Sequence, residues 1–529
     1  MATTLSALDA HQHPWASLLE REDVVLDHGM LHLVHDDVTP AEARISDLLL
    51  VASTLESAGI PVILIRHSNT VPAIVVDDSL RQEAFDALVA LCSSEPLYAK
   101  TKGKTTVPLP DVAIRNSGPS SVRIFRPRRA ASGGKRYGAE HAARVEFWHF
   151  GEELIEAPLN NALTRRIMPA EDIVFADVTR FGREWRTVSG MFEAHPSEIT
   201  HDIDMVFSWV DGSSTEFQRQ RAAQMAGYVV GEGDDGAARF RHVDELRYAL
   251  RSVHMYAPWV RRIFIATDSP RPAWLADDPR VTIVRSEEFF DDSAALPTHN
   301  SHAVESQLHK IDGLAEHFLY SNDDMFFGRA VQPEMFFTPG GLTQFVECDV
   351  RIGTGNRALH RSGHDNALRL NRELLRERFG RTIVRDLEHC ATPLRRSVLE
   401  ELERVFPEDF ARTAASRFRA ATDISVTNCL YHYYALFTGR AVATTAPHTR
   451  YVQTTLADSL RKIERLDDGT IDMFCLNDGG EAEVPEEVRV RVLSDALERM
   501  FPVRAPWEIA AVSAASSAER FGARSGALS

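Results

Sequence analysis

The segment 202–212 constrains the fold more than any other part of the chain. It reads DIDMVFSWVDG, a near-continuous apolar run that closes in an Asp-Gly pair. Strands with this composition are buried on both faces, as in sheets covered by helices on both sides. Ligands of open α/β sheets bind beyond the carboxyl ends of such strands. The segment therefore predicts an inner strand followed by a functional loop.

Helix and strand patterns alternate after residue 200. Helical periods are expected over 243–259, over 301–311 with Ser301 as N-cap, and over 366–383 and 394–440, and apolar strands over 261–268, 281–290 and 317–327. Such alternation is typical of a parallel sheet with helices on both faces. We expect an α/β fold with a mostly parallel, Rossmann-like or GT-A-like sheet and a helical insertion.

The first 195 residues have the pattern of a separate, smaller α/β unit. Helical patterns cover 40–59 and 79–92, and short β-rich runs cover 61–66, 72–77 and 145–150. The basic run 121–136 contains Gly133-Gly134 and predicts a loop, either a solvated one or a docking patch for an anionic polymer or membrane surface. A chain of 529 residues suggests several domains. We expect an accessory N-terminal α/β domain over 1–195, a catalytic domain over 200–510 and a disordered tail over 511–529.

Charge and composition exclude several classes of protein. The net charge of -17 disfavours nucleic acid as a partner, because binding to a phosphate backbone needs a basic face. No apolar run reaches the roughly 18 residues of a transmembrane helix, and the first residues lack a secretory pattern. We therefore expect a cytoplasmic protein. Peripheral attachment at the inner membrane face and homo-oligomerisation both stay open. The five cysteines are widely separated, which predicts reduced thiols.

The strongest chemical signal is Asn322-Asp323-Asp324, at the end of the apolar run 317–327. Ionised carboxylates are costly beside a packed sheet unless they hold a cation or leave the core. Oxygen ligands of this kind suit Mg²⁺ or Mn²⁺, and such an ion could bridge a nucleotide diphosphate. The alternative is a turn with helix-capping aspartates.

Two weaker signals accompany it. Asp211-Gly212 ends the apolar strand, and Gly212 permits close backbone approach to a phosphate or base. Arg247 and Arg419 suit phosphate recognition, and His389 could act as a general acid or base. Each of these residues could equally be structural.

Taken together and in order, these segments resemble the Stealth family of sugar-1-phosphate transferases, which includes bacterial capsule and exopolysaccharide phosphotransferases and the catalytic subunit precursor of the lysosomal-enzyme GlcNAc-1-phosphotransferase. The resemblance rests on IDMVFSWVDG, on the run from RHVDELRYALRSVHMYAPWVRRIFIATD to SNDDMFFG, on the run from NALRLNRELLRERFG through EHCATPLRR to FRAATD, and on FCLND. It covers about residues 200–480.

The resemblance implies roles for individual residues. Asp324, His389 and Arg419 would be catalytic. The family's third block usually reads His-x-Pro, whereas in this chain the proline after His389 comes two positions later, at Pro393. The residues expected to contact the donor are Asp211, Gly212, Arg247 and Asn322, and those expected to bind the metal are Asp323, Asp324 and Asp478. The implied partners are a nucleotide-sugar donor, UDP-GlcNAc above all, and a polysaccharide or oligosaccharide acceptor.

The implied reaction transfers a hexose-1-phosphate from a UDP-sugar to a sugar hydroxyl and releases UMP. The general base is either His389 or Asp324. Two alternatives stay open: a metal-dependent GT-A-type glycosyltransferase, which would release UDP, and a polysaccharide assembly protein without catalysis.

Overall fold

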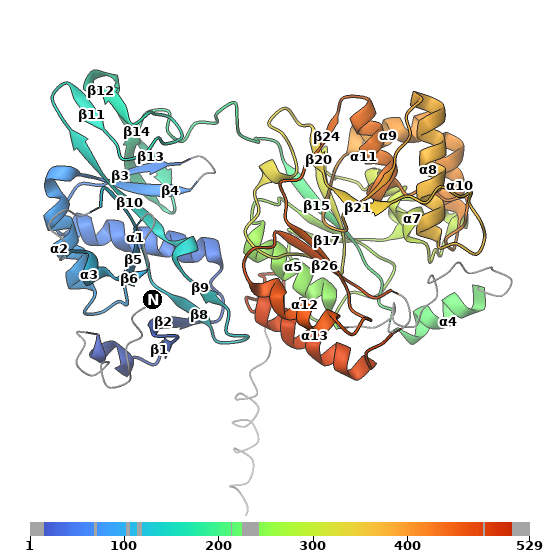
Figure 1. The fold of residues 1–529 in the computed structure, drawn as a ribbon, viewed down its shortest axis with the longest axis horizontal. Helices are drawn as coiled ribbons and strands as arrows, with labels where there is room; N and C mark the ends of the chain where they lie inside the picture. Colours follow the sequence, from blue (N-terminus) through green and yellow to red (C-terminus); the bar gives the residue numbers. More distant parts are fainter. Residues whose placement is uncertain are drawn as a thin grey trace, which may run out of the picture.

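A computed structural model describes residues 15–67, 71–101, 106–113, 119–212, 214–224, 243–479 and 482–509. The chain forms two lobes joined by an extended segment near residue 195 (Figure 1). The predicted tail 511–529 lies outside the described residues.

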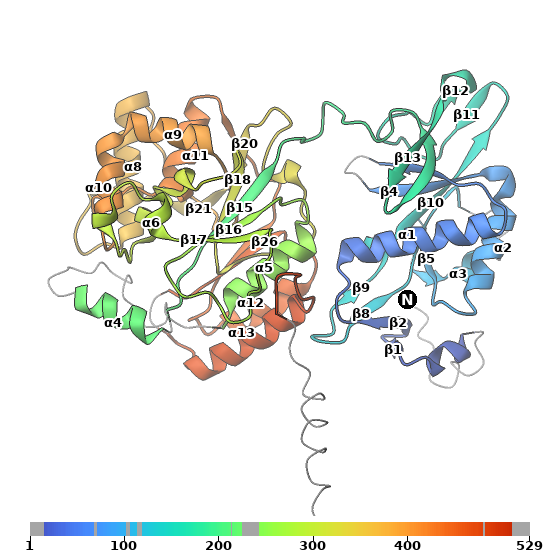
Figure 2. The ribbon, with the colours of Figure 1, turned by 180° about the vertical axis from the view of Figure 1, so that it is seen from behind.

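The N-terminal lobe is built on a mixed sheet whose longest path runs in the order β13-β14-β3-β4-β10-β7-β5-β6. Strands β3 and β4 are antiparallel, whereas β4 and β10 are parallel, and α1 packs along the sheet (Figure 2). A small α/β unit is confirmed here. Its helices and strands are β1 (Val24–Asp27), β2 (Met30–His35), α1 (Pro40–Ser57), β3 (Ile63–Arg66), β4 (Pro72–Asp77), α2 (Arg81–Leu91), β5 (Tyr98–Lys100), β6 (Val107–Pro108), α3 (Leu109–Ala113), β7 (Ser121–Phe125), β8 (Arg128–Ala130), β9 (Arg136–Tyr137), β10 (Ala143–Phe150), β11 (Leu154–Glu156), β12 (Ile167–Pro169), β13 (Phe175–Arg180) and β14 (Arg183–Val188).

The prediction of a basic loop over 121–136 is wrong. This segment forms β7, β8 and the start of β9, and only the turn at Gly133-Gly134 is a loop. Arg126 and Arg128 both donate to Asp47, whose carboxylate is fully buried on α1. A buried carboxylate needs such paired donors, so two of the basic side chains hold the lobe together and do not form a free patch.

The C-terminal lobe contains a five-stranded sheet in the order β17-β16-β15-β18-β23. Its first four strands are parallel and only β23 is antiparallel, which confirms the mostly parallel sheet. The lobe comprises β15 (Ile203–Ser208), α4 (Thr215–Gln224), α5 (Glu245–Tyr256), β16 (Ile263–Ala266), β17 (Val281–Val284), α6 (Ser286–Phe289), α7 (Ser301–Glu305), β18 (His317–Asn322), β19 (Met325–Phe327), β20 (Thr343–Phe345), β21 (Glu347–Arg351), α8 (Gly363–Phe379), β22 (Arg385–Leu387), β23 (Thr392–Arg395), α9 (Arg396–Val405), α10 (Pro407–Ala415), α11 (Tyr431–Phe437), β24 (Ala441–Ala443), β25 (Thr449–Gln453), α12 (Ser459–Glu464), β26 (Met473–Asn477) and α13 (Glu486–Met500).

Alternate residues of β15 supply the two cores that flank this sheet. Ile203, Met205 and Phe207 belong to the core beneath α5, whereas Val206 belongs to the core beneath α7, α8 and α9. Asp204 also lies inside β15 and is buried, where it accepts hydrogen bonds of 2.8 and 2.6 Å from Arg261. This carboxylate is therefore structural.

Four predicted elements differ from the structure. The strand expected over 281–290 ends at Val284, and α6 begins at Ser286. The apolar run 317–327 is not one strand, because β18 joins the parallel sheet and β19 joins a second sheet with β26 and β25. The helix expected over 301–311 ends at Glu305, and its N-cap is Asn300, whose side chain accepts from the His302 amide. The region 394–440 is helical but begins with the end of β23.

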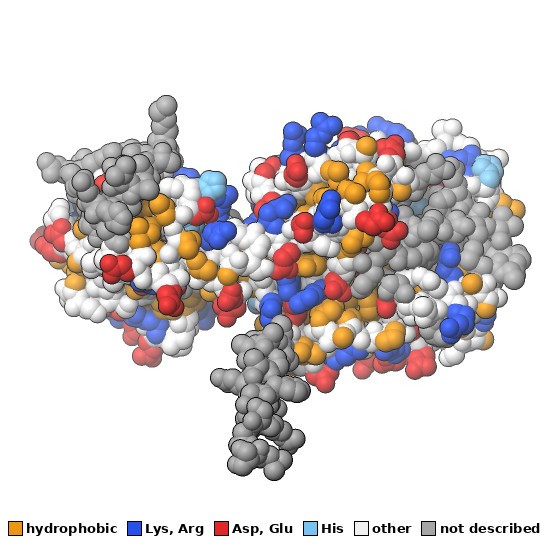
Figure 3. Space-filling model, turned by 90° about the horizontal axis from the view of Figure 1, so that it is seen from below, with side chains coloured by type: hydrophobic (Ala, Val, Ile, Leu, Met, Phe, Trp, Pro, Cys, Tyr) orange, Lys and Arg blue, Asp and Glu red, His pale blue; other side chains and the backbone are white. Residues whose placement is uncertain are grey.

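The two lobes also meet away from the connecting segment. Lys135 at the β8–β9 turn forms an ion pair with Asp467, and Ser132 donates to Glu498 on α13. Over the described part of the surface seen from below, acidic and basic side chains are interspersed (Figure 3). Among the described residues, no helix combines the length and apolar character needed to cross a membrane. All five cysteines are free.

Candidate active site

The candidate site begins at the carboxyl end of β18. Asn322 is the last residue of this strand, and its Oδ1 accepts a hydrogen bond of 2.9 Å from the Tyr320 hydroxyl. The same hydroxyl lies 3.2 Å from Oε1 of buried Glu305, whose Oε2 accepts from Thr427 Oγ1 at 2.7 Å. Burial raises the pKa of Glu305. The Tyr320 hydroxyl therefore links Asn322 at the strand end to the buried Glu305.

Asp324 follows the strand end and faces β26. Its Oδ2 accepts a weak hydrogen bond of 3.5 Å from the Cys475 thiol, and its backbone carbonyl accepts from the Leu476 amide at 2.9 Å. Burial, together with the charges of Glu245 and Asp478, raises the pKa of Asp324 to about 6. Several carboxylates thus converge on one buried point.

Asp478 reaches this point from the end of β26. Its Oδ1 lies 3.2 Å from Nη1 of the buried Arg489 and also accepts from the Thr454 hydroxyl. The charge of Asp323 adds to burial and to Asp324 in raising the pKa of Cys475. The structure therefore brings together the three residues that were expected to bind a metal.

The side chains fit a divalent cation that is completed by substrate. The Oδ1 atom of Asp324 is buried and has no hydrogen-bond partner among the described residues. Within the same residues, no three His, Cys, Asp or Glu side chains are arranged as a complete metal site. Mg²⁺ commonly binds through one or two carboxylates, with water and substrate phosphates as further ligands. One or two of these carboxylates and a diphosphate meet that requirement.

Arg419 lies in the loop after α10, and two contacts fix this loop. Asn300 Nδ2 donates to Asp423 Oδ2 at 2.8 Å, and Arg419 Nη2 donates to Ser301 Oγ at 2.9 Å. Both partners come from the start of α7. Burial raises the pKa of both Glu305 and Tyr320, and the nearby charge of Arg419 opposes part of that rise. Arg419 thus lies near the Asn322 end of the site.

His389 lies between β22 and β23, beside a second histidine. The ring centroids of His389 and His364 are 6.0 Å apart, and the Tyr451 ring is 5.5 Å from His389 on another side. Burial and the charges of His364 and Arg419 lower the pKa of His389 to about 4. At neutral pH His389 is therefore uncharged.

Two of the expected donor-binding positions lie at the same sheet edge. Asp211 and Gly212 follow β15, whose end pairs with Asn322 through Ser208, and the Asp211 amide donates to Ser269 Oγ at 2.8 Å. Arg247 lies on α5, and its Nε donates to Glu508 at 2.7 Å. Arg251 binds the same carboxylate, so the contacts of Arg247 belong to the packing of α5 against the C-terminal segment.

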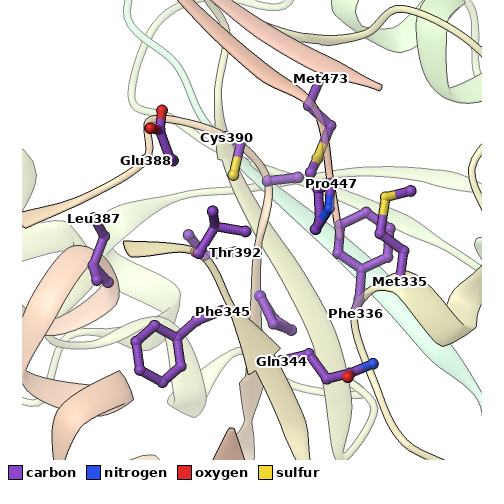
Figure 4. Close-up of a pocket in the computed structure, with 13 residues that line it drawn as sticks. Met335, Phe336, Gln344, Phe345, Leu387, Glu388, Cys390, Thr392, Pro447 and Met473 are labelled. Carbon is purple, nitrogen blue, oxygen red and sulfur yellow. The ribbon is translucent and has the colours of Figure 1, made fainter. Parts of the chain in front are cut away.

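A pocket of about 290 Å³ lies beside the site, beneath the segment that follows His389 (Figure 4). Met335, Phe336 and Met473 form one side of it, and the carboxylate of Glu388 points away from them. None of the residues expected from the sequence to form the site lines this pocket. Its apolar walls do not suit a diphosphate.

Several residues of the site were not expected from the sequence. They are Glu305, His364, Asp386 and Cys475. The 301–311 helix signal could have suggested Glu305, because it placed this carboxylate on a face that also carries apolar residues. The pairing of His364 with Asp386 has no local signal.

The four conserved regions of the Stealth family match this chain. Conserved region 1 matches residues 201–229, region 2 matches 239–345, region 3 matches 388–436 and region 4 matches 465–517. The "Exopolysaccharide phosphotransferase CpsY" of Mycobacterium tuberculosis is 52% identical over 492 residues, which cover 92% of each chain.

The chain belongs to the Stealth family. A further Stealth relative is the "Exopolysaccharide phosphotransferase" of Nocardia farcinica, 50% identical over 476 residues, or 90% of this chain and 89% of that one. The prediction of a transferase enzyme is confirmed by these relatives. A crystal structure of the galactosyltransferase LgtC with donor and acceptor sugar analogues shares 12% identity, covers 55% of this chain and 95% of that chain, and has a TM-score of 0.28.

The four Stealth regions contain every residue that was expected to form the site, with Asp211 and Gly212 in region 1 and Asp478 in region 4. Regions 2 and 3 hold Asn322-Asp323-Asp324, His389 and Arg419. The third block was expected to begin at residue 366, but region 3 begins at 388. His364 and Asp386 therefore lie between matched regions.

Proposed function

We propose that this Stealth protein transfers a hexose-1-phosphate, GlcNAc-1-phosphate in the first instance, from a UDP-sugar to a sugar hydroxyl of an exopolysaccharide. The products are a phosphodiester and UMP. The observation that carries the proposal is the buried Asp324 carboxylate, one oxygen of which has no hydrogen-bond partner among the described residues, at a strand end near the charge of Arg419. The names of the relatives support phosphate transfer and a polysaccharide acceptor.

Phosphoryl transfer depends mainly on positioning and on neutralising charge. Asp323 and Asp324, with Asp478 nearby, would hold Mg²⁺ or Mn²⁺. The bound cation would neutralise the donor diphosphate as charge develops on the leaving group. Arg419 would also bind the diphosphate, because its planar guanidinium can donate two hydrogen bonds to phosphate oxygens.

The other residues of the site would bind and orient the substrates. Asn322, held by Tyr320, would donate its amide hydrogens to the donor. Asp211 and Gly212 would contact the nucleotide at the end of β15. His389, uncharged at neutral pH, or Asp324 would accept the acceptor proton. Arg247, on α5, would contact the donor at the same edge of the sheet.

The remaining assignments concern the whole chain. Residues 1–195 would form an accessory domain and residues 200–510 the catalytic domain. The two lobes have separate hydrophobic cores, which supports this division. Because a UDP-sugar donor is made in the cytoplasm, we place the enzyme there, with contact to the inner membrane face as part of the proposal.

The nucleotide released on turnover tests the reaction. Purified protein, MgCl₂ and an oligosaccharide acceptor are incubated with a panel of nucleotide-sugars, and the nucleotides are separated by ion-exchange chromatography. Acceptor-dependent UMP is expected. UDP would instead indicate glycosyl transfer, and binding of the donor without any release would indicate an assembly protein. Either result would overturn the proposed reaction.

A matched pair of variants tests the carboxylate. Asp324→Asn should lower turnover at least about 10³-fold, because a lost metal ligand removes several kcal/mol of transition-state stabilisation. Asp277→Asn changes an exposed carboxylate paired with Arg271 and should leave turnover unchanged. Normal turnover by Asp324→Asn would remove this residue from the mechanism.

A further inference from the structure

His364 and Asp386 form a hydrogen-bonded pair at the edge of the site. Nε2 of His364 and Oδ2 of Asp386 are 2.7 Å apart. Asp386 is itself fixed, because its Oδ1 accepts from the Leu387 amide at 2.8 Å. The His364 side chain is 32% exposed, whereas that of Asp386 is 12% exposed. The carboxylate is thus the buried partner and the imidazole the accessible one.

The pair lies directly beside Arg419. Gly363 precedes His364 at the start of α8, and a Cβ atom at Gly363 would lie 2.6 Å from Cβ of Arg419. The arginine side chain therefore crosses the backbone next to His364. Charged and titratable groups face His364 from four segments: Asp386 on β22, His389 before β23, Arg419 after α10 and Glu305 on α7.

We propose that His364, oriented by Asp386, and not His389 or Asp324, is the general base that accepts the proton of the attacking acceptor hydroxyl. The carboxylate holds the neutral imidazole with its proton on Nε2, which leaves the lone pair of Nδ1 for the substrate. Among the described residues, Nδ1 has no hydrogen-bond partner. The inference rests on the proposed function and names a residue that lies outside the matched Stealth regions.

The step balances without a further reactant. The acceptor O–H bond breaks and its proton passes to Nδ1 of His364, while the acceptor oxygen forms a bond to the sugar-bearing phosphorus of the donor. The bond between that phosphorus and the bridging oxygen breaks, and its electron pair leaves with UMP. Asp386 stabilises the imidazolium that results.

The neighbouring histidine is a poorer base. No hydrogen bond from His389 to a carboxylate is found among the described residues, and burial lowers its pKa to about 4 although the charge of Asp386 opposes this change. Burial alone would lower the pKa of His364 as well, but the hydrogen bond and charge of Asp386 outweigh it and raise that pKa. A base works best with a pKa near the working pH, which favours His364.

Three variants test the assignment: His364→Gln, Asp386→Asn and, as a matched control, His309→Gln. His309 also pairs with a carboxylate, that of Glu403 on α9, at 2.8 Å, and neither residue belongs to the candidate site. We expect His364→Gln to lower kcat about 10²–10⁴-fold, with the donor Kd from calorimetry changed less than about twofold. His309→Gln, checked for folding by circular dichroism, should retain kcat.

The pH profile separates proton transfer from a merely structural role. Asp386 raises the pKa of His364, so Asp386→Asn should move the rising limb of kcat/KM to lower pH and reduce its plateau. A normal kcat in His364→Gln, or an unmoved limb in Asp386→Asn that still turns over, would overturn the inference. Release of UDP by the wild-type protein would overturn the proposed function alone, because any transfer to a hydroxyl still needs a base.

Discussion

The side chain of Arg419 lies against the backbone of Gly363, with no room for a side chain between them. A Cβ atom at Gly363 would come within 2.6 Å of Cβ and 2.9 Å of Cδ of Arg419. Glycine is needed here because of this close approach, since Gly363 is not among the residues with positive φ. The start of α8 and the loop that carries Arg419 therefore set each other's position.

The first prediction follows from that contact. Gly363→Ala should displace Arg419 and lower kcat/KM about 10–10²-fold, because phosphate contacts depend on position to within about an ångström. Its melting temperature should fall by a few degrees at most, because the preference of a helix for alanine over glycine offsets part of the cost of displacing Arg419. Gly340→Ala is the control: its Cβ would meet only Thr338 Oγ1, at 3.9 Å. Steady-state kinetics and a thermal melt measure both, and unchanged kcat/KM in Gly363→Ala would contradict the prediction.

A second prediction concerns stability and pH. The pKa of Asp324 is raised in the folded protein to about 6 from 3.8, so the folded state binds this proton more tightly than the unfolded chain does. Without metal, stability is therefore lost as pH rises from about 4 through 6. Asp324→Asn should melt above the wild-type protein by about 2–4 °C or more at pH 7.5, and the gap should narrow at pH 5.

A bound divalent cation should oppose the loss of stability that the ionised Asp324 causes above about pH 6. Adding MgCl₂ with a nucleotide diphosphate should raise the wild-type melting temperature at pH 7.5 and leave that of Asp324→Asn unchanged, because a ligand stabilises only the state that binds it. Differential scanning calorimetry with EDTA as reference makes the comparison. Equal shifts in both proteins would place the metal elsewhere.

The third prediction concerns Tyr320. Tyr320→Phe removes the hydrogen bond to Asn322 and leaves Glu305 with one partner fewer. We expect kcat/KM to fall about 10-fold and unfolding to cost about 1–3 kcal/mol less. The buried hydroxyl of Tyr434 pairs with Glu401 outside the site, so Tyr434→Phe should alter stability but not activity. The prediction is wrong if both variants behave alike in the kinetic assay.

The fourth prediction concerns the contact between lobes. Gly133 and Gly182 both have positive φ, 63° and 77°, so alanine is strained equally at either position. Only at Gly133 would the new Cβ meet the other lobe, 2.7 Å from Cα of Arg499. Gly133→Ala should therefore make the segment near residue 195 more sensitive to limited proteolysis, whereas Gly182→Ala should not. Identical digestion patterns would show that this contact does not hold the lobes.

The sequence predicts the parallel strands and the acidic strand end well, because a long apolar run that ends in acidic residues fits a strand leaving the core and little else. It does not predict the break at Asp323-Asp324, since the residues on both sides are equally apolar. The pair Arg128–Asp47 was also missed, because its partners are 81 positions apart and charge alone suggests exposure. His364 and Asp386 escaped for the same reason: a lone histidine is ordinary until the fold supplies its carboxylate.

The break after β18 has a mechanical consequence. Only Asp323 and Asp324 separate a strand of the parallel sheet from β19, which pairs with β26 through Met325 and Cys475. The acidic pair is thus a two-residue hinge between two separately hydrogen-bonded sheets. Asp478 follows β26, which belongs to the second of these sheets. A ligand that bridges these carboxylates would lock the hinge. We expect hydrogen exchange at β25 and β26 to slow on donor binding, although neither strand belongs to the parallel sheet.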